Sequence, residues 1–227
     1  APEVIDAFGT LDNLCPRLHL PLQSGSDRIL KAMGRKYDMA RYMDIVQRLK
    51  AARPDIQLST DIIVGFPGET EQDFEDTLAA MRAVGFAASF SFCYSDRPGT
   101  RADMLPGKLD AAEKAARLAR LQEWQNDYTE QCLRNMVGLH TMALLDGMSR
   151  KPGDGHAHDG NPGGESWQGR DPYGQAVNVV LPPRPADGLA NGLANGLADR
   201  PEGWLGQIVP VTIVEAKKHS LRGVLRT

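Results

Sequence analysis

The sequence has few cysteines, no long apolar run and no large excess of charge of either sign. Its three cysteines, Cys15, Cys93 and Cys132, are odd in number and far apart, which argues against a disulfide framework and favours a reducing compartment such as the cytoplasm. No apolar run approaches the roughly 20 residues that a membrane-spanning helix needs, and no signal peptide is visible. The net charge of −3 gives no overall signature of a nucleic-acid binder, although a local basic patch could still grip RNA.

The first hundred residues alternate between strand and helix patterns. In the segment "MARYMDIVQRLKAA" (39–52), apolar residues recur at i, i+3, i+4 and i+7, which indicates one buried helix face. The run Ile62–Val64 is typical of a parallel strand that is covered on both faces. Strands separated by helices predict the βα units of a parallel sheet. The expected strands are 17–22, 56–64 and 87–93, and a long helix is expected at 110–135.

Beyond this helix, glycine and proline become frequent and the helical period disappears. The segments "HTMALLDG", "QAVNVVLP" and "GQIVPVTIVEAKKHSLRGVL" predict the short strands of a small β-barrel. Two insertions, "SRKPGDGHAHDGNPGGESWQG" and the repeated "GLANGLANGLAD", are expected to be loops. His156 and His158 could hold a metal, but without a third ligand nearby we expect a solvated loop. The predicted domains are 1–136 and 137–227.

Polar side chains follow the predicted strands at the edge where parallel strands end. Gln23 follows the first strand, Asp61 lies near the end of the second, and Tyr94 follows the third. Ligands of α/β folds bind at this edge. Amide and carboxylate groups suit ribose hydroxyls, and the guanidinium of Arg35 suits a carboxylate. The turn at Gly65, in "VGFPGET", lets the backbone approach a flat ligand. Each residue taken alone has an ordinary structural explanation.

Three segments, in this order and spacing, resemble a known enzyme family. "LHLPLQSGSDRILKAMGRKY", "TDIIVGFPGET" and "FSFCYSDRPGT" are similar to the radical S-adenosylmethionine (SAM) enzymes, and most closely to their methylthiotransferases. The resemblance implies an α/β fold, a partial (β/α) radical SAM barrel of parallel strands. The segment "IVPVTIVEAKKHSLRG" is similar to the end of the family's TRAM domain, which implies a small, OB-like, RNA-binding β-barrel after the long helix.

The resemblance also implies roles for individual residues. Gln23 and Arg35 are twelve residues apart, and Asp61 lies on the next strand, as SAM ligands do in related enzymes. Gln23 and Asp61 would then hold the ribose of S-adenosyl-L-methionine, and Arg35 its carboxylate. The remaining expected cofactor contacts, which include the adenine site, are Ser24, Ile63, Gly65 and Phe92–Tyr94. In the TRAM-like part, the expected contacts to tRNA phosphates are Lys217, Lys218 and Arg222.

The chain departs from the family in its cysteines. Radical SAM enzymes hold a [4Fe–4S] cluster with three cysteines in C-x3-C-x2-C, and this sequence contains no such run. We therefore expect neither a metal site nor a catalytic residue in this chain. The expectation is a C-terminal fragment of a longer, monomeric enzyme, which is inactive without the N-terminal half that carries the clusters.

The implied reaction is methylthiolation of C2 of the isopentenylated adenosine beside the anticodon, so the implied partner is the anticodon loop of tRNA. Within the family, the alternatives are threonylcarbamoyladenosine in tRNA and an aspartate of a ribosomal protein. A non-catalytic RNA-binding protein with a degenerate barrel is the alternative from a different class. The retained Gln23, Arg35 and Asp61 argue against that last reading, because a binding module has no evident need for them.

Overall fold

The βα repeats of the sequence form a three-stranded parallel sheet in the computed structural model, which describes residues 2–149, 165–182 and 204–226. The strands β1 (Arg17–His19), β2 (Gln57–Val64) and β3 (Ala88–Cys93) lie in the order β1-β2-β3. Leu18 pairs with Leu58, and Asp61 pairs with Phe90. The prediction of three parallel strands in these segments is confirmed.

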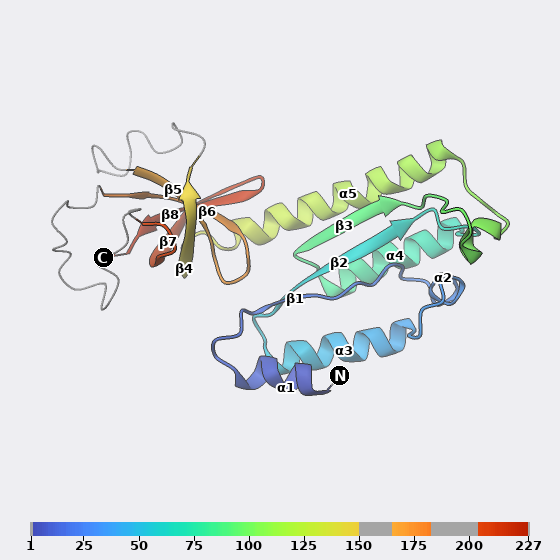
Figure 1. Cartoon of the computed structure of the whole chain (residues 1–227), viewed down its shortest axis with the longest axis horizontal. Helices are drawn as coiled ribbons and strands as arrows, with labels where there is room; N and C mark the ends of the chain where they lie inside the picture. The colour runs from blue at the N-terminus through green and yellow to red at the C-terminus, as the bar shows by residue number, and fades with distance from the viewer. Residues whose placement is uncertain (1, 150–164, 183–203, 227) are drawn as a thin grey trace. The chain divides into compact units, whose positions relative to one another are not determined.

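Helices cover one face of this sheet (Figure 1). They are α3 (Met39–Ala52), α4 (Glu71–Val84) and most of α5 (Ala111–Arg134). Alternate residues of β2 point toward them, so Leu58, Ile62 and Val64 are buried. Phe74 of α4 and Leu121 of α5 are fully buried in the same core. The helix α1 (Pro2–Thr10), which the sequence patterns did not predict, contributes Phe8 to this core and packs against α3.

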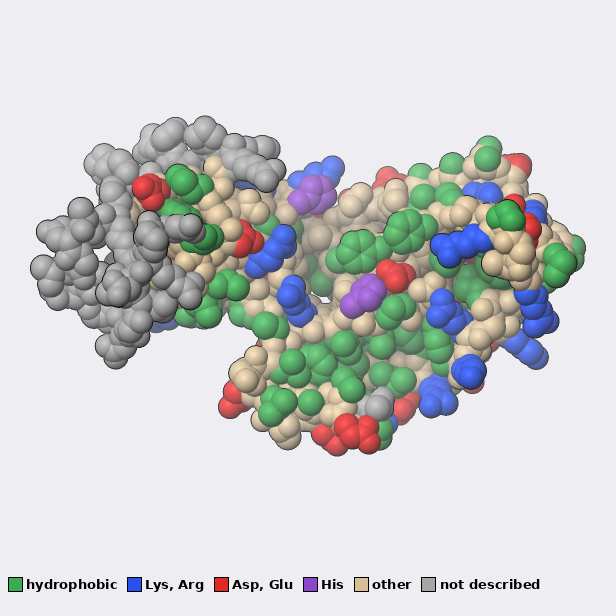
Figure 2. Space-filling view, viewed as in Figure 1, with side chains coloured by type: hydrophobic (Ala, Val, Ile, Leu, Met, Phe, Trp, Pro, Cys, Tyr) green, Lys and Arg blue, Asp and Glu red, His purple; other side chains and the backbone are tan. Residues whose placement is uncertain are grey.

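The opposite face of the sheet carries exposed apolar side chains. Phe90 and Phe92 of β3 are each 57% exposed, and hydrophobic side chains are visible over this sheet in Figure 2. This parallel sheet is therefore covered by helices on one face and leaves apolar side chains exposed on the other.

The helix ends follow from local sequence signals. Thr70 caps α4 by accepting a hydrogen bond from the Asp73 backbone N–H, while the Asp73 side chain accepts one from the Thr70 N–H. This reciprocal pair satisfies two backbone donors that the helix itself leaves unbonded. Gly85 ends the helix with a left-handed φ of 69°, a conformation that glycine adopts without steric cost. The short helix α2 (Asp27–Ala32) begins after Ser26.

The second unit of the chain is a closed β-barrel with the strand order β4-β5-β6-β8-β7. Its strands are β4 (His140–Met148), β5 (Glu165–Arg170), β6 (Ala176–Leu181), β7 (Ile208–Lys217) and β8 (Ser220–Leu225). Leu145, Trp167 and Val211 are among its buried side chains, and Leu133 at the end of α5 completes this core. The small β-barrel expected from the sequence is confirmed. The chain divides into Ala1–Thr129 and Glu130–Thr227, whereas the predicted boundary was residue 136.

Two details of the second unit differ from the sequence-based expectation. Part of the first predicted insertion forms a strand, because "ESWQGR" is β5 and pairs with both β4 and β6. The terminal segment "EAKKHSLRGVL" is a hairpin, since β7 ends at Lys217 and β8 begins at Ser220. The "GLANGLANGLAD" repeat lies outside the described residues.

Candidate functional site

Gln23 has an unusual backbone conformation at the end of the first strand segment. Its φ is 70°, and it is the one non-glycine residue with positive φ within the described ranges. Its N–H donates to Asp61 O at 2.8 Å, and its carbonyl accepts from Ile63 N–H at 2.9 Å, so β2 holds it on both sides. Strained backbone conformations cost about 1–3 kcal/mol and gather at functional sites. Gln23 is therefore a candidate for a functional role.

The serine-rich turn after Gln23 faces α4. Ser24 is 1% exposed, and its hydroxyl lies 3.4 Å from that of Thr77. The Gly25 N–H donates to the same Thr77 hydroxyl at 2.9 Å, and Ser26 donates to the Asp73 carboxylate at 2.7 Å. These contacts fasten the turn to α4. Ser24, expected at the cofactor, lies in this packing and does not line the cavity described next.

A cavity of about 730 Å³ lies at the carboxyl ends of β2 and β3. This volume falls within the roughly 300–1,000 Å³ that is typical of small-molecule sites. Six of the expected cofactor contacts line it together, namely Gln23, Arg35, Ile63 and Phe92–Tyr94. Phe66 and Phe92 add aromatic surface, with the rings of Phe66 and Tyr94 meeting edge to face. The cavity thus combines apolar walls with an amide, a phenol and a guanidinium.

Two arginines of this cavity, Arg97 and Arg101, were not assigned from the sequence. They lie on the loop after β3, within and next to the quoted "YSDRPGT". Two basic residues that closely follow a strand end are the signal that could have indicated them.

Asp61 lies on the open face of the sheet, outside the lining of this cavity. Its Oδ1 is 3.3 Å from Nε2 of His19, and Nδ1 of the same ring is 3.0 Å from the Ser59 hydroxyl. The His19 ring also meets Phe90 edge to face. Because alternate residues of a strand share a face, Asp61 is next to Ile63 on that face. The expected convergence therefore holds for Gln23, Arg35 and Ile63, while Asp61 pairs with His19.

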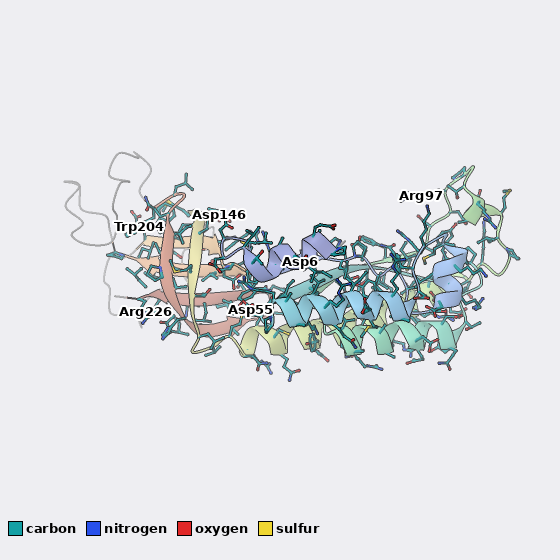
Figure 3. The ribbon with its side chains drawn as sticks, turned by 90° about the horizontal axis from the view of Figure 1, so that it is seen from below. Asp6, Asp55, Arg97, Asp146, Trp204 and Arg226 are labelled. Atoms are coloured by element: carbon teal, nitrogen blue, oxygen red, sulfur yellow. The ribbon has the colours of Figure 1, made fainter. Side chains whose placement is uncertain are left out.

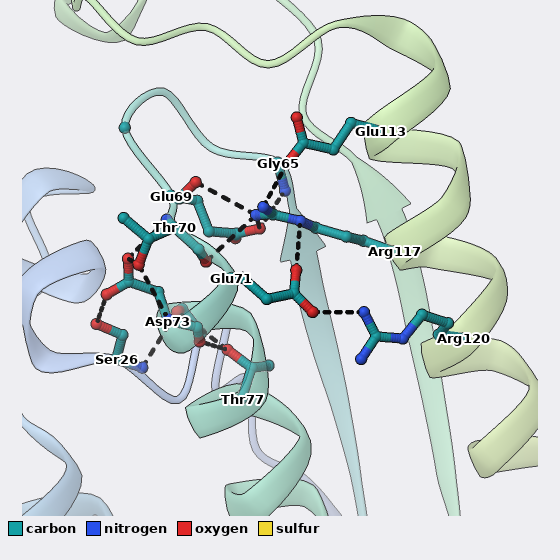
Figure 4. A network of polar contacts seen from close by, with 12 residues as sticks. Ser26, Gly65, Glu69, Thr70, Glu71, Asp73, Thr77, Glu113, Arg117 and Arg120 are labelled. Carbon is teal, nitrogen blue, oxygen red and sulfur yellow. Dashed lines mark hydrogen bonds and ion pairs between the residues drawn. The ribbon is translucent and has the colours of Figure 1, made fainter.

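A buried ion network fixes the turn that follows β2 (Figure 4). Glu69 accepts hydrogen bonds from Gly65 N–H at 2.9 Å and from Arg117 of α5 at 2.7 Å. The side chains of Glu69 and Arg117 are 2% and 5% exposed. Burial raises the pKa of Glu69, against the hydrogen bonds from Gly65 and Arg117, which lower it. Gly65 has a φ of 71°, and a Cβ there would overlap the Lys114 side chain, so its role is to shape this turn.

The loop between β3 and α5 is held at several points. Lys108 forms ion pairs with Asp96 at 2.8 Å and with Asp103 at 3.1 Å. The hydrogen bond from Lys108 lowers the pKa of the Asp96 carboxyl. The N–H of Gly68 donates to the carbonyl of Gly107 at 2.8 Å, which joins the loop to the turn after β2. The cavity is therefore bordered by a loop with fixed attachments.

The three cations that the resemblance implies for tRNA binding lie on the β7–β8 hairpin. Lys217 ends β7, Lys218 lies in the turn, and Arg222 lies on β8. Arg222 forms an ion pair with Glu215 at 2.8 Å. Arg222 therefore already has an anionic partner.

The described part of the chain shows neither a metal centre nor a membrane span. No group of three or more His, Cys, Asp or Glu side chains within it could hold a metal ion. Cys15 and Cys93 are free thiols, and Cys93 borders the cavity. His156 and His158 lie outside the described residues. None of the described helices is both long enough and apolar enough to cross a membrane.

Comparison with known proteins supports the resemblance. Residues 1–81 match the model of the Radical SAM superfamily. The chain is 61% identical over 221 residues to a tRNA-2-methylthio-N(6)-dimethylallyladenosine synthase of Nitratidesulfovibrio vulgaris, which covers 97% of this chain and 44% of that protein. The proteins of the same name from Oleidesulfovibrio alaskensis and Lawsonia intracellularis are 60% and 50% identical, covering 98% and 96% of this chain. The chain spans less than half the length of these relatives. The matches confirm the resemblance to the radical SAM methylthiotransferases.

Proposed function

We propose that this chain is the C-terminal part of a radical SAM enzyme that methylthiolates C2 of the isopentenylated adenosine beside the anticodon of tRNA. The observation that carries the proposal is that Gln23, Arg35 and Ile63 line one cavity. The chain is also 61% identical to a tRNA-2-methylthio-N(6)-dimethylallyladenosine synthase. The complete enzyme would act in the cytoplasm as a monomer.

S-adenosylmethionine fits the chemistry of this cavity. The Arg35 guanidinium suits its carboxylate, because two parallel N–H donors match a carboxylate bidentately. The Gln23 amide suits a ribose hydroxyl, and Ile63 with Phe92 offers apolar surface for adenine. Asp61, beside Ile63 on the sheet face, is proposed as a second ribose contact. When bound, SAM supplies both the methyl group and the radical source, and the protein orients it against the target base.

The rest of such an enzyme would supply what this chain lacks. The relatives are more than twice as long as the aligned segment. We propose that the additional part brings the [4Fe–4S] clusters and the barrel strands that cover Phe90 and Phe92. The open apolar face supports this proposal, because exposed apolar patches mark interaction surfaces.

The β-barrel is proposed to bind RNA as a TRAM-like domain. Lys217, Lys218 and Arg222 on one hairpin would neutralise tRNA phosphates, and the domain would begin near residue 137. The ion pair between Arg222 and Glu215 would weaken the contribution of that residue relative to the two lysines.

Titration of SAM into the complete enzyme tests the cofactor site. Arg35→Lys and Gln23→Ala should each lower the affinity for SAM by roughly 5- to 150-fold, because a polar group of the ligand loses its partner. Arg41→Lys, on the exposed surface of α3, is the matched control and should leave the affinity unchanged. Asp61→Ala belongs to the same series, and the binding of tRNA should be nearly untouched in all of them. Unchanged SAM affinity in both Arg35→Lys and Gln23→Ala would show that the cofactor binds elsewhere.

A further inference from the structure

Three guanidinium groups line the same cavity. Arg35 follows α2, and Arg97 and Arg101 belong to the loop after β3. Figure 3 shows Arg97 on this loop, at the same end of the first unit as η1 (Arg101–Met104). In the described part of the chain, none of the three side chains forms a hydrogen bond or an ion pair. Arginines without protein partners around a cavity indicate that the cavity receives anionic groups.

The acidic residues of the loop do not neutralise these arginines. Asp96 and Asp103 are the carboxylates nearest to them in sequence, and Lys108 bridges both, at 2.8 and 3.1 Å. The positive charges of Arg97 and Arg101 therefore remain available to a ligand.

The loop that carries the arginines is fixed in place. Gly107 and Gly68 approach so closely that a Cβ on Gly107 would lie 3.2 Å from the Gly68 backbone. Lys114 of α5 also donates to the carbonyl of Tyr94, at 3.2 Å. A held loop presents its cations with a smaller loss of conformational entropy on binding.

The proposed cofactor accounts for only one of these three cations. SAM has a single carboxylate, which Arg35 suits, and a positively charged sulfonium. Two further guanidiniums beside a ligand with a positive centre would repel it unless another anion were present. The exposed guanidiniums of Arg97 and Arg101 are thus left for a second, anionic ligand.

We infer that Arg97 and Arg101 bind a phosphodiester of the RNA strand that presents the target nucleotide. This inference rests on the proposed function, and it names the part of the substrate that this side of the cavity recognises. Phosphate contacts set the position and register of a nucleic acid, and unstacked RNA bases bind on aromatic side chains. Phe92 and Tyr94 supply aromatic surface in the same cavity. The two arginines would hold the backbone while the base enters.

Binding of a tRNA anticodon stem-loop to the complete enzyme tests the inference. The double variant Arg97→Gln/Arg101→Gln should bind the RNA with an affinity roughly 10- to 100-fold lower, because charge-assisted hydrogen bonds are lost. The slope of the logarithm of the binding constant against the logarithm of the salt concentration should also become less steep, by about 0.7 for each phosphate contact removed. SAM affinity should change little. Arg41→Gln with Arg82→Gln, two exposed arginines on α3 and α4, is the control for the same loss of charge elsewhere.

A second arm locates the phosphate. Neutral methylphosphonate linkages are placed one at a time along the anticodon loop. At one position of the loop, the neutral linkage should lower the affinity of the RNA for the unmodified enzyme. The same linkage should not lower the affinity for the Arg97→Gln/Arg101→Gln variant any further, because the linkage and the substitutions remove the same contact.

The outcomes separate the inference from the proposed function. If the double variant binds RNA as the control does, or if only its SAM affinity falls, the inference is wrong and the proposed function stands. The inference is equally wrong if every linkage affects enzyme and variant alike. If the unmodified enzyme binds SAM but not this RNA, the proposed substrate is wrong, and the inference falls with it.

Discussion

Gly25 lies in the turn after Gln23, where the backbone packs directly against the backbone of α4. A Cβ at this position would lie 2.5 Å from both the carbonyl oxygen of Asp76 and the Cα of Thr77. Both atoms belong to the backbone of α4, which cannot move aside as a flexible side chain could. The turn that presents Gln23 to the cavity therefore depends on the missing side chain.

We predict that Gly25→Ala lowers the free energy of unfolding by about 2–3 kcal/mol, because the added methyl group forces strand and helix apart. Urea unfolding followed by circular dichroism measures this change. Gly9→Ala is the matched control, since a Cβ in that helix would make ordinary contacts of 3.5 Å with Ala52. It should leave stability unchanged or raise it by about 0.5–1 kcal/mol. Equal effects of the two substitutions would contradict this view of Gly25.

Which side chains share the cavity could be anticipated from the sequence only in part. Gln23 and Arg35, twelve residues apart, do line one cavity. The placement of Ser24 against Thr77 could not be foreseen, because α4 comes from a distant part of the sequence. The partnership of Asp61 with His19 likewise depends on the register between strands.

Asp73 joins the beginnings of two helices. Its carboxylate accepts from Ser26, the N-cap of α2, and from Thr70, the N-cap of α4, and it pairs with Arg28. Burial raises the pKa of Asp73, but the hydrogen bonds from Thr70, Arg28 and Ser26 outweigh it and hold the pKa well below its usual range. The folded state therefore binds this proton less readily than the unfolded state does.

The charged form of Asp73 should stabilise the fold fully above about pH 4, the usual pKa of an unfolded aspartate, and progressively less as the pH falls further. We predict that Asp73→Asn costs roughly 3 kcal/mol at pH 7 and flattens the loss of stability below pH 4. Urea unfolding between pH 2.5 and 7 measures both effects. Asp76→Asn, an exposed position of the same helix, should reproduce neither. If the free energy of unfolding of Asp73→Asn falls below pH 4 as steeply as that of the unmodified protein, Asp73 does not have this role.

Elements with local end signals can be located from the sequence, whereas elements without them cannot. The start of α4 after Thr70 and its end at Gly85 follow from capping chemistry within a few residues. The strand β5 was missed because glycines and prolines precede it, and because its stability comes from pairing with β4 and β6. The β7–β8 hairpin was read as one strand because its turn, at Lys218 and His219, has none of the residues that usually mark two-residue turns.

The residues that the structure describes form two separate hydrophobic cores. The first includes Phe74, and the second includes Leu145, with no buried residue belonging to both. Units with their own cores can unfold separately.

We predict two unfolding transitions that respond to different substitutions. Phe74→Ala should lower the free energy of one transition by about 3–5 kcal/mol, because it leaves a cavity in the first core. Leu145→Ala should lower the free energy of the other by about 2–5 kcal/mol for the same reason in the second core. Denaturant unfolding followed by the circular dichroism of helices and of strands distinguishes the two transitions. A single transition that both substitutions lower would show that the units unfold together.

The pairing of β4 with β7 closes the barrel, and it joins His140 to Thr212. The chain between β6, which ends at Leu181, and β7, which begins at Ile208, is a connection whose ends are fixed by the same barrel. The entropy of closing a connection grows with the logarithm of its length, so that even doubling it costs only about 0.6 kcal/mol. One more "GLAN" unit between β6 and β7 would add far less than that. Lengthening the repeat at this place should therefore be nearly neutral for the stability of the barrel.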